Sequence, residues 1–157
     1  MHIYNLRKAK YAKELVASGV SNRWNREDEF VIYARSTRAL AYLESLVLHN
    51  NINLYSDYKM LEIAVETGQT ELHDTNEKNS MIQHIDSNSV PQDWQRLKHY
   101  GTTQQLGSDW YQKCEKLLLR VPSVLIPQEY NFLINTRHPD FEMKVSILRT
   151  EEFTWNF

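Results

Sequence analysis

Residues 23–44 have the sequence RWNREDEFVIYARSTRALAYLE and contain a predicted buried strand followed by the start of a helix. Residues 30–33 are apolar, β-branched or aromatic and follow charged residues, which is typical of a buried strand. Thr37 occupies the position of a helix N-cap, because good helix formers follow it over residues 39–48. The stretch therefore predicts a short strand and then a helix that carries Glu44.

Glu44 lies on the predicted apolar face of this helix. The residues three and four positions away share that face, and they are Leu40, Ala41, Val47 and Leu48. A carboxylate there points toward the core, where an ionised group costs several kcal/mol unless it is paired or hydrogen-bonded. Two interpretations carry about equal weight: a structural ion pair with Arg23 or Arg38, and a catalytic carboxylate.

The length and composition are typical of one globular domain. The chain has 157 residues, enough to bury a core, and its single cysteine, Cys114, excludes an internal disulfide framework. We therefore expect a single domain over residues 1–157. The sequence shows no signal-peptide core and no apolar run near about 18 residues, so we expect a soluble, cytoplasmic protein without a membrane role.

The charge distribution argues against nucleic-acid binding. The formal net charge is −2, and lysine and arginine are scattered along the chain. A nucleic-acid-binding protein normally gathers basic residues on one face, because counterion release drives its binding. We therefore expect no direct contact with nucleic acid.

The other strands are predicted from apolar runs and alternation. They are expected at residues 2–6, 58–65, 117–121, 129–135 and 143–148. The 58–65 strand is expected beside the 30–33 strand. The continuous apolar run at 117–121 indicates a strand buried on both faces, which Pro122 ends.

Helices are expected over residues 9–17 and from Thr102 or Thr103 to Tyr111. Residues 66–90 are polar and predict a surface excursion with one short helix. The aromatic tail, residues 153–157, predicts an edge strand or a packed arm. Because strands and helices mix without a regular βαβ rhythm, we expect an α+β fold with a mixed β-sheet core and flanking helices.

Several common site motifs are missing from the sequence. The six histidines lack metal-ligand spacing and Cys114 has no neighbouring ligand candidate, so we expect no metal site. Glycine-rich nucleotide-binding motifs are absent as well. Ser123 lacks the Gly-x-Ser-x-Gly motif of a nucleophile, and a hydroxyl directly after Pro122 is more typical of a turn or cap residue.

A series of separated motifs resembles the RES domain family, which is named for an arginine, a glutamate and a serine. In chain order they are RWN (23–25), VIY (31–33), ALAYLE (39–44), PQDW (91–94), LGSDW (106–110), LRVPS (119–123), EYNFLIN (129–135) and HPDF (138–141). The resemblance covers nearly the whole chain, and the order of the motifs makes it more specific than any single one. It implies a fold similar to ADP-ribosyltransferases and the activity of a bacterial toxin that cleaves NAD.

The resemblance also assigns site residues. The arginine of Arg-Trp-Asn falls on Arg23, the strand-end tyrosine on Tyr33, the helix glutamate on Glu44 and the serine of Val-Pro-Ser on Ser123. Asn131 in the EYNFLIN motif is expected to contact the substrate as well.

Two positions depart from the pattern of many family members. Ser21 and Asn22 stand where many members have two glycines, which affects a loop that could require positive φ. Asn5 stands where many members have an arginine in the first strand. Arg7 lies two residues on, hence on the same face if the strand continues, and could take the place of that arginine.

The implied reaction breaks the nicotinamide–ribose bond through a transition state with positive charge on the sugar. Glu44 would accept a hydrogen bond from a ribose hydroxyl and stabilise that charge. Arg23 offers a planar fork of donors for the diphosphate or an incoming phosphate. Tyr33 would stack on nicotinamide or hydrogen-bond the ribose, and Ser123 would position rather than attack.

The resemblance leaves the acceptor of the ADP-ribose open. Water would make the protein an NAD glycohydrolase, and inorganic phosphate, as a co-substrate, would make it an NAD phosphorylase. Two alternatives are a protein ADP-ribosyltransferase and a non-catalytic RES fold kept for partner binding. In each enzymatic case NAD is the substrate, and no separate cofactor is expected.

The resemblance further implies a partner, because an enzyme that destroys NAD would arrest its own cell unless it were inhibited. The expected partner is an Xre-type antitoxin that covers the mouth of the active site and carries the DNA-binding function. Its contact surface is expected near Arg23, Tyr33 and residues 66–90. A toxin homodimer is expected through the aromatic tail at Phe153, Trp155 and Phe157.

Overall fold

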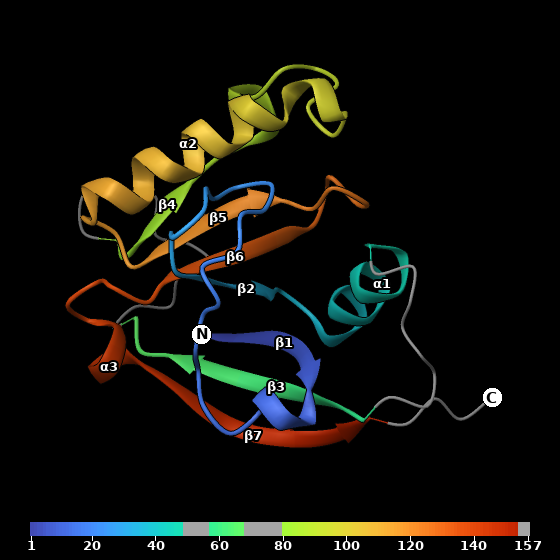
Figure 1. The fold of residues 1–157 in the computed structure, drawn as a ribbon, viewed down its shortest axis with the longest axis vertical. Coiled ribbons are helices and arrows are strands. Elements are labelled where there is room, and N and C mark those ends of the chain that lie inside the picture. The colour runs from blue at the N-terminus through green and yellow to red at the C-terminus, as the bar shows by residue number, and fades with distance from the viewer. Residues whose placement is uncertain (49–56, 68–79, 154–157) are drawn as a thin grey trace.

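The computed structural model describes residues 1–48, 57–67 and 80–153 and contains a seven-stranded sheet in the order β4-β5-β6-β2-β1-β3-β7 (Figure 1). The strands are β1 (His2–Lys8), β2 (Val31–Arg35), β3 (Tyr58–Val65), β4 (Ile82–His84), β5 (Leu118–Pro122), β6 (Tyr130–Asn135) and β7 (Val145–Phe153). Neighbouring strands are antiparallel except β4 and β5, which are parallel. The predicted α+β fold with a mixed sheet is confirmed.

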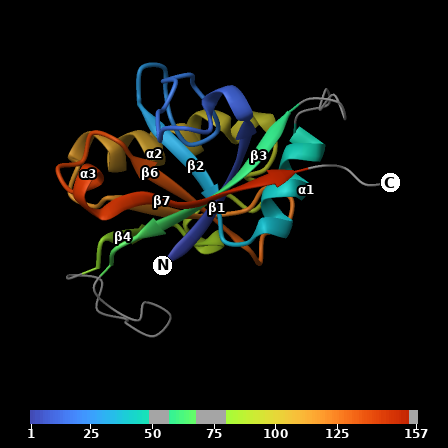
Figure 2. The same cartoon turned by 90° about the horizontal axis from the view of Figure 1, so that it is seen from below.

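The helices lie around this sheet. They are α1 (Arg38–Leu48), α2 (Tyr100–Lys113) and the short α3 (Phe141–Lys144). Helix α2 runs alongside β4 and β5, whereas α1 lies beside β1 and β2 (Figure 1). Figure 2 shows α1 and α3 near opposite ends of β7. Within the described ranges, no helix is long and apolar enough to cross a bilayer.

Strands β1 and β2 join two well-paired parts of the sheet. β1 pairs with β3 along its whole length, and β2 does the same with β6. Between β1 and β2, however, the register is confined to the pair Tyr4 and Arg35. The two strands therefore diverge beyond that pair, which leaves room between Arg7 and the start of β2.

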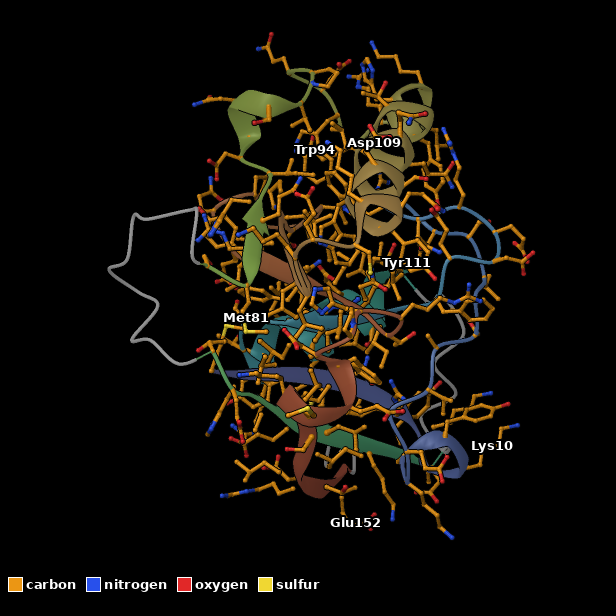
Figure 3. All side chains as sticks on the ribbon, turned by 90° about the vertical axis from the view of Figure 1, so that its left-hand side faces the viewer. Lys10, Met81, Trp94, Asp109, Tyr111 and Glu152 are labelled. Atoms are coloured by element: carbon orange, nitrogen blue, oxygen red, sulfur yellow. The ribbon has the colours of Figure 1, made fainter. Side chains whose placement is uncertain are left out.

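Two buried clusters occupy different sides of β2, because successive side chains of a strand point to opposite faces. The first contains Ile32 and Ala34 with Ile3, Leu61, Ile63, Leu118 and Ile134. The second contains Val31 with Trp24, Trp94, Trp110, Tyr111, Leu119, Val121 and Leu133, and Tyr33 packs against it. Figure 3 shows Trp94 next to α2. The face with Tyr33 is therefore the face that α2 covers.

Two predictions about β3 and β5 have different outcomes. The bounds predicted for β3 are those observed, but its predicted place beside β2 is wrong, since β1 lies between them. A strand's own alternation shows its faces but does not specify its neighbour. β5 lies between β4 and β6, and Leu118 and Leu119 are both fully buried, which confirms the strand buried on two faces.

The predicted helix over residues 9–17 is wrong, since only Ala9–Tyr11 forms a single 3-10 turn. The Arg7 guanidinium explains the difference. Its Nη1 donates to the carbonyls of Tyr11 and Glu14, both at 3.2 Å. These two carbonyls accept hydrogen bonds from a side chain of β1. The segment is therefore held against β1 and does not form the backbone hydrogen bonds of a helix.

Helix α2 begins at Tyr100, so neither Thr102 nor Thr103 is its cap. Thr103 lies inside the helix, fully buried, and its hydroxyl donates to the Tyr100 carbonyl at 3.0 Å. The late strand begins at Val145, since the residues of α3 just before it are helical.

The polar segment 66–90 is described only in part. Its described residues form strand β4 and a 3-10 turn at Ser87–Ser89. Residues 68–79 lie outside the described residues, as do 154–157 of the aromatic tail.

Candidate functional site

Helix α1 carries Glu44 into the molecule, as the sequence predicts. The Leu40 amide donates to Thr37 Oγ1 at 3.1 Å, so Thr37 is the predicted N-cap. Leu40, Ala41 and Glu44 are each about 1% exposed. The carboxylate is therefore held in an environment where it needs compensating partners.

Three side chains from three strands or strand ends donate to Glu44. Ser123 Oγ donates to Oε1 at 2.6 Å, and Arg35 Nε donates to Oε2 at 2.8 Å. Asn131 Nδ2 contacts both oxygens, at 2.9 and 3.0 Å. These contacts use the acceptor positions of an ionised carboxylate, which is what a buried charge requires.

Arg35 is the ion-pair partner of Glu44, so the predicted pairing with Arg23 or Arg38 is wrong. Arg38 points away and pairs with Glu62 and Glu151, linking α1 to β3 and β7. Arg35 reaches Glu44 because β2 continues two residues beyond Tyr33 on the same face. That alternation is the sequence signal that could have identified Arg35.

A cavity of about 240 Å³ opens beside Glu44. Four of the predicted site residues line it, namely Arg23, Tyr33, Glu44 and Asn131, together with Arg35, Asn22, Trp24, Leu48, Tyr100, Pro122 and Val124. The cavity thus brings together residues from β2, α1, β6, α2 and the loop before β2. The sequence spreads them from the first quarter of the chain to the last.

Ser123 is fully buried and is not among the residues that line the cavity. Its Oγ donates to Glu44 and accepts the amides of Leu125 and Ile126, both at 3.2 Å. It is therefore both the strand-end cap and a support of the carboxylate. Any effect of Ser123 on a bound molecule would pass through Glu44.

Arg23 lies over two aromatic rings at the cavity wall. Its guanidinium carbon is 5.8 Å from the Trp94 ring centre and 5.3 Å from that of Tyr100, and Nη1 donates to the Trp94 carbonyl at 3.4 Å. Partial burial lowers the pKa of Arg23, which remains a cation. No carboxylate in the described part of the chain pairs with it. A bound anion would supply the missing charge.

Tyr33 fixes the loop that carries Arg23. Its hydroxyl donates to Asn25 Oδ1 at 2.7 Å and accepts the Trp24 amide at 3.2 Å. Burial raises the pKa of Tyr33, so the hydroxyl stays protonated. Tyr33 lines the cavity, and its hydroxyl positions the Arg-Trp-Asn segment.

Glycine at position 107 lets the same loop approach α2 closely. A Cβ at Gly107 would lie 1.7 Å from the Trp24 carbonyl oxygen. Glu29, which is 3% exposed, accepts from Ser108 Oγ at 2.8 Å and from the Arg26 amide at 2.6 Å. These contacts hold the loop against α2 and set the cavity wall.

The replacement of two glycines by Ser21 and Asn22 does not strain this loop. Positive φ occurs at Gly19 and Asp28, with values of 76° and 63°, and not at Ser21 or Asn22. The positions that depart from the family pattern therefore adopt backbone conformations open to any residue.

Comparison with known proteins identifies the family of this chain. The RES domain model matches residues 3–156. A protein of Yersinia enterocolitica named "Toxin Res" is 29% identical over 140 residues, covering 89% of this chain and 84% of the relative. A "Toxin Res" of Photorhabdus laumondii is 26% identical over 158 residues, covering 98% and 93%. A Sphingobium protein named "Prs ADP-ribosylating toxin" is 34% identical over 118 residues, covering 75% and 68%. This chain belongs to the RES domain family.

Proposed function

We propose that this protein is a toxin that cleaves NAD at the bond between nicotinamide and ribose. The observation that carries the proposal is Glu44, a carboxylate that is 1% exposed, lines a cavity and is paired with Arg35. A buried carboxylate at a cavity wall is suited to stabilising a cation that forms beside it. The names of the family relatives support the role of a toxin.

In the proposed reaction, the bond between ribose C1 and the nicotinamide nitrogen breaks, and its electron pair stays on the nitrogen. Nicotinamide leaves as a neutral molecule, so no general acid is needed on that side. The sugar becomes an oxocarbenium-like cation, which Glu44 stabilises by its charge. An acceptor oxygen then bonds to C1; water releases one proton to the solvent in this step, whereas an ionised phosphate oxygen has no proton to release.

The contacts of Glu44 indicate how it acts. Ser123 and Arg35 each occupy one oxygen, and Asn131 shares one nitrogen between both. A ribose hydroxyl that donates to Glu44 would therefore compete with the shared contact of Asn131, which is the longest of the three. Stabilisation by charge requires no such exchange, and we propose it as the main contribution.

Arg23 and Tyr33 are proposed to bind the rest of the molecule. The Arg23 guanidinium has no carboxylate partner among the described residues and suits a phosphate oxygen. The Tyr33 ring offers an apolar surface for nicotinamide. Because its hydroxyl is already bonded to Asn25 and Trp24, stacking is favoured over hydrogen bonding to the ribose.

The test is incubation of the purified protein with NAD, with and without inorganic phosphate, while nicotinamide and the sugar product are quantified. Release of nicotinamide with ADP-ribose identifies a glycohydrolase. Release that requires phosphate, with a phosphorylated sugar product, identifies a phosphorylase. Absence of nicotinamide release in both conditions would overturn NAD cleavage and favour a non-catalytic RES fold.

Protein ADP-ribosylation is a second candidate, favoured by the name of the Sphingobium relative. The bond that breaks is the same, and only the acceptor differs. Incubation with NAD labelled in the adenine, followed by separation of proteins from small molecules, distinguishes the two. Label on a protein acceptor supports transfer, whereas label in free ADP-ribose or its phosphate supports cleavage alone.

We also propose that an Xre-type antitoxin, made alongside this single-domain cytoplasmic protein, covers the cavity mouth near Arg23. The expression "toxin" in the relatives' names supports a partner of this kind. Expression of this chain alone should arrest growth with loss of NAD, and co-expression with the neighbouring small reading frame should restore both. We also propose a toxin homodimer through the aromatic tail. This proposal is based on the sequence alone, because residues 154–157 lie outside the described residues.

A further inference from the structure

Helix α2 carries a row of residues spaced four apart along one side. They are Tyr100, Gln104, Ser108 and Gln112, called the α2 row below. Residues four apart in a helix lie one above the other, and such a row winds slowly around the helix. Each member of the row contacts residues 22–29, called the Arg23 loop below, which pass close to α2 in Figure 1.

The first half of the Arg23 loop is a turn that is attached to the start of α2. Asn22 and Asn25 each donate their backbone amide to the carbonyl of the other, at 3.0 and 3.3 Å, so Arg23 and Trp24 form the turn between them. Gln104 Nε2 donates to both of those carbonyls, at 3.0 and 3.1 Å. The turn that presents Arg23 is therefore held by α2 as well as by its own backbone.

The second half of the loop is attached to α2 through the buried carboxylate of Glu29. Its Oε2 accepts from Ser108 Oγ at 2.8 Å and from Gln112 Nε2 at 3.1 Å. Its Oε1 accepts the Arg26 amide at 2.6 Å, and its carbonyl accepts Asn25 Nδ2 at 3.2 Å. Glu29 thus links the α2 row to the residues directly after Arg23.

The charge of Glu29 is not used in an ion pair. Within the described ranges, no lysine, arginine or histidine pairs with this carboxylate, and its three donors are neutral. A buried carboxylate needs its hydrogen bonds, and bonds to an ionised acceptor are about twice as strong as bonds between neutral groups. Glu29 therefore holds the loop against α2 more firmly than a neutral side chain of the same shape would.

We propose that Glu29 is a positioning residue for Arg23. By binding Ser108 and Gln112, it holds the Arg23 loop against α2 and keeps the Arg23 guanidinium at the cavity beside Glu44. The inference rests on the proposed function, in which Arg23 binds the phosphates of NAD. Glu29 is not among the residues that line this cavity, so its effect on a bound molecule passes through the loop.

A general contribution to stability is the competing explanation, because a buried carboxylate with three donors also supports the folded state. The two explanations differ in what the folded protein does. A general contribution changes the unfolding transition and leaves the ligand affinity of the folded protein unchanged. A positioning role predicts local opening of the Arg23 loop and a loss of affinity that depends on Arg23.

Limited proteolysis measures the attachment of the loop without any ligand. Trypsin can cut after Arg23 and Arg26 only when the loop leaves α2, and mass spectrometry of the fragments separates these two cuts from all others. Glu29→Gln and Ser108→Ala should each raise the rate of these cuts about 10-fold or more, while the unfolding transition stays cooperative. Thr102→Ala is the matched control for Ser108→Ala, since it removes a hydroxyl from an exposed position of the same helix, and its rates should equal those of the wild type. Unchanged rates in both Glu29→Gln and Ser108→Ala would overturn the proposal.

Equilibrium binding of ADP-ribose measures the dependence on Arg23, and it does not require cleavage. Arg23→Gln should weaken binding about 10- to 100-fold, and Glu29→Gln should weaken it severalfold. The double variant should bind no more weakly than Arg23→Gln alone, because Glu29 acts through Arg23. Glu62→Gln makes the same change at another buried carboxylate, on β3, and should leave the affinity unchanged. In NAD cleavage, Glu29→Gln should raise KM and leave kcat within about twofold of the wild type.

Losses of affinity that add in the double variant would overturn the positioning role, as would ADP-ribose binding by Glu29→Gln as tight as that of the wild type. A wild type that does not bind ADP-ribose would overturn it as well. If Glu29→Gln is unfolded, Ser108→Ala takes its place in every measurement. The proposed reaction fails separately: a wild type that binds ADP-ribose with this dependence on Arg23 but releases no nicotinamide contradicts NAD cleavage and supports the role of Glu29.

Discussion

Asn131 places one amide nitrogen against both carboxylate oxygens of Glu44, at 2.9 and 3.0 Å. The Oδ1 of the same amide is buried and has no hydrogen-bond partner among the described residues. Rotating the amide would satisfy neither group, because two oxygens would then face each other. Asn131 therefore leaves its Oδ1 without a partner in the orientation that lets its Nδ2 donate to Glu44.

Replacing Asn131 by aspartate should place a second carboxylate against Glu44. Like charges at this distance repel each other, and Glu44 also loses the amide that donates to both of its oxygens. The rate of NAD cleavage should therefore fall about 10²-fold. Asn22→Asp adds the same charge at an exposed position of the cavity lining and should lower the rate less. Equal rates for Asn131→Asp and the wild type would show that Asn131 does not support Glu44.

Arg35→Met should remove the cation that compensates Glu44. Breaking a buried ion pair from one side typically costs about 3–5 kcal/mol of unfolding free energy, because the other charge stays buried. The double variant Arg35→Met/Glu44→Gln should recover part of that loss, since no charge is then left unpaired. Denaturant unfolding of both variants measures the difference. A double variant less stable than Arg35→Met alone would contradict the pairing.

Gly107→Ala should displace the loop that carries Trp24, because the new Cβ would lie 1.7 Å from the Trp24 carbonyl oxygen. We expect a loss of stability of about 1–3 kcal/mol and weaker NAD cleavage. Gly101→Ala is the control on the same helix, where nothing lies within 4 Å of the new Cβ. It should stabilise α2 by about 0.5–1 kcal/mol. Thermal unfolding of the two variants tests the contrast, and equal behaviour would argue against close contact between loop and helix.

Much of this arrangement could be predicted from the sequence, and the reasons differ by element. The burial of Glu44 and the cap at Thr37 follow from local periodicity, and the structure confirms both. The α+β fold follows from the mix of elements. Proximity in sequence does not separate Arg35 from Arg23 and Arg38 as the ion-pair partner of Glu44, but strand alternation does, because it places Arg35 on the same face of β2 as Tyr33.

Long-range contacts account for the errors. The place of β3 depends on which strand pairs with β1, and the missing helix after β1 depends on Arg7 binding its carbonyls. The cavity lined by Arg7 and Tyr33 forms where β1 and β2 diverge, and the sequence of a single strand does not predict that divergence. Local sequence patterns do not predict contacts between residues far apart in the chain. The site residues are therefore predicted mainly by the family resemblance.

Asp93 should hold the segment that carries Trp94 and Tyr100 in place over a wide pH range, including acidic pH. Lys98 and His99 hold the pKa of Asp93 at about 2, with the Lys98 hydrogen bond as the main cause. A lowered pKa gives stability that is present above the ordinary carboxyl value of about 4 and lost as the pH falls to about 2. Tryptophan fluorescence should therefore change between about pH 4 and 2. Asp93→Asn should remove that step, and its persistence would assign the change to another group.

The most direct test of the proposed activity is the release of nicotinamide from NAD by wild type and Glu44→Gln, compared at equal concentrations of folded protein. The substitution keeps the size of the side chain and removes the charge that would stabilise the developing sugar cation. We expect the rate to fall about 10²- to 10³-fold while the unfolding transition remains cooperative. A folded Glu44→Gln protein that releases nicotinamide as fast as the wild type would contradict the catalytic role of Glu44.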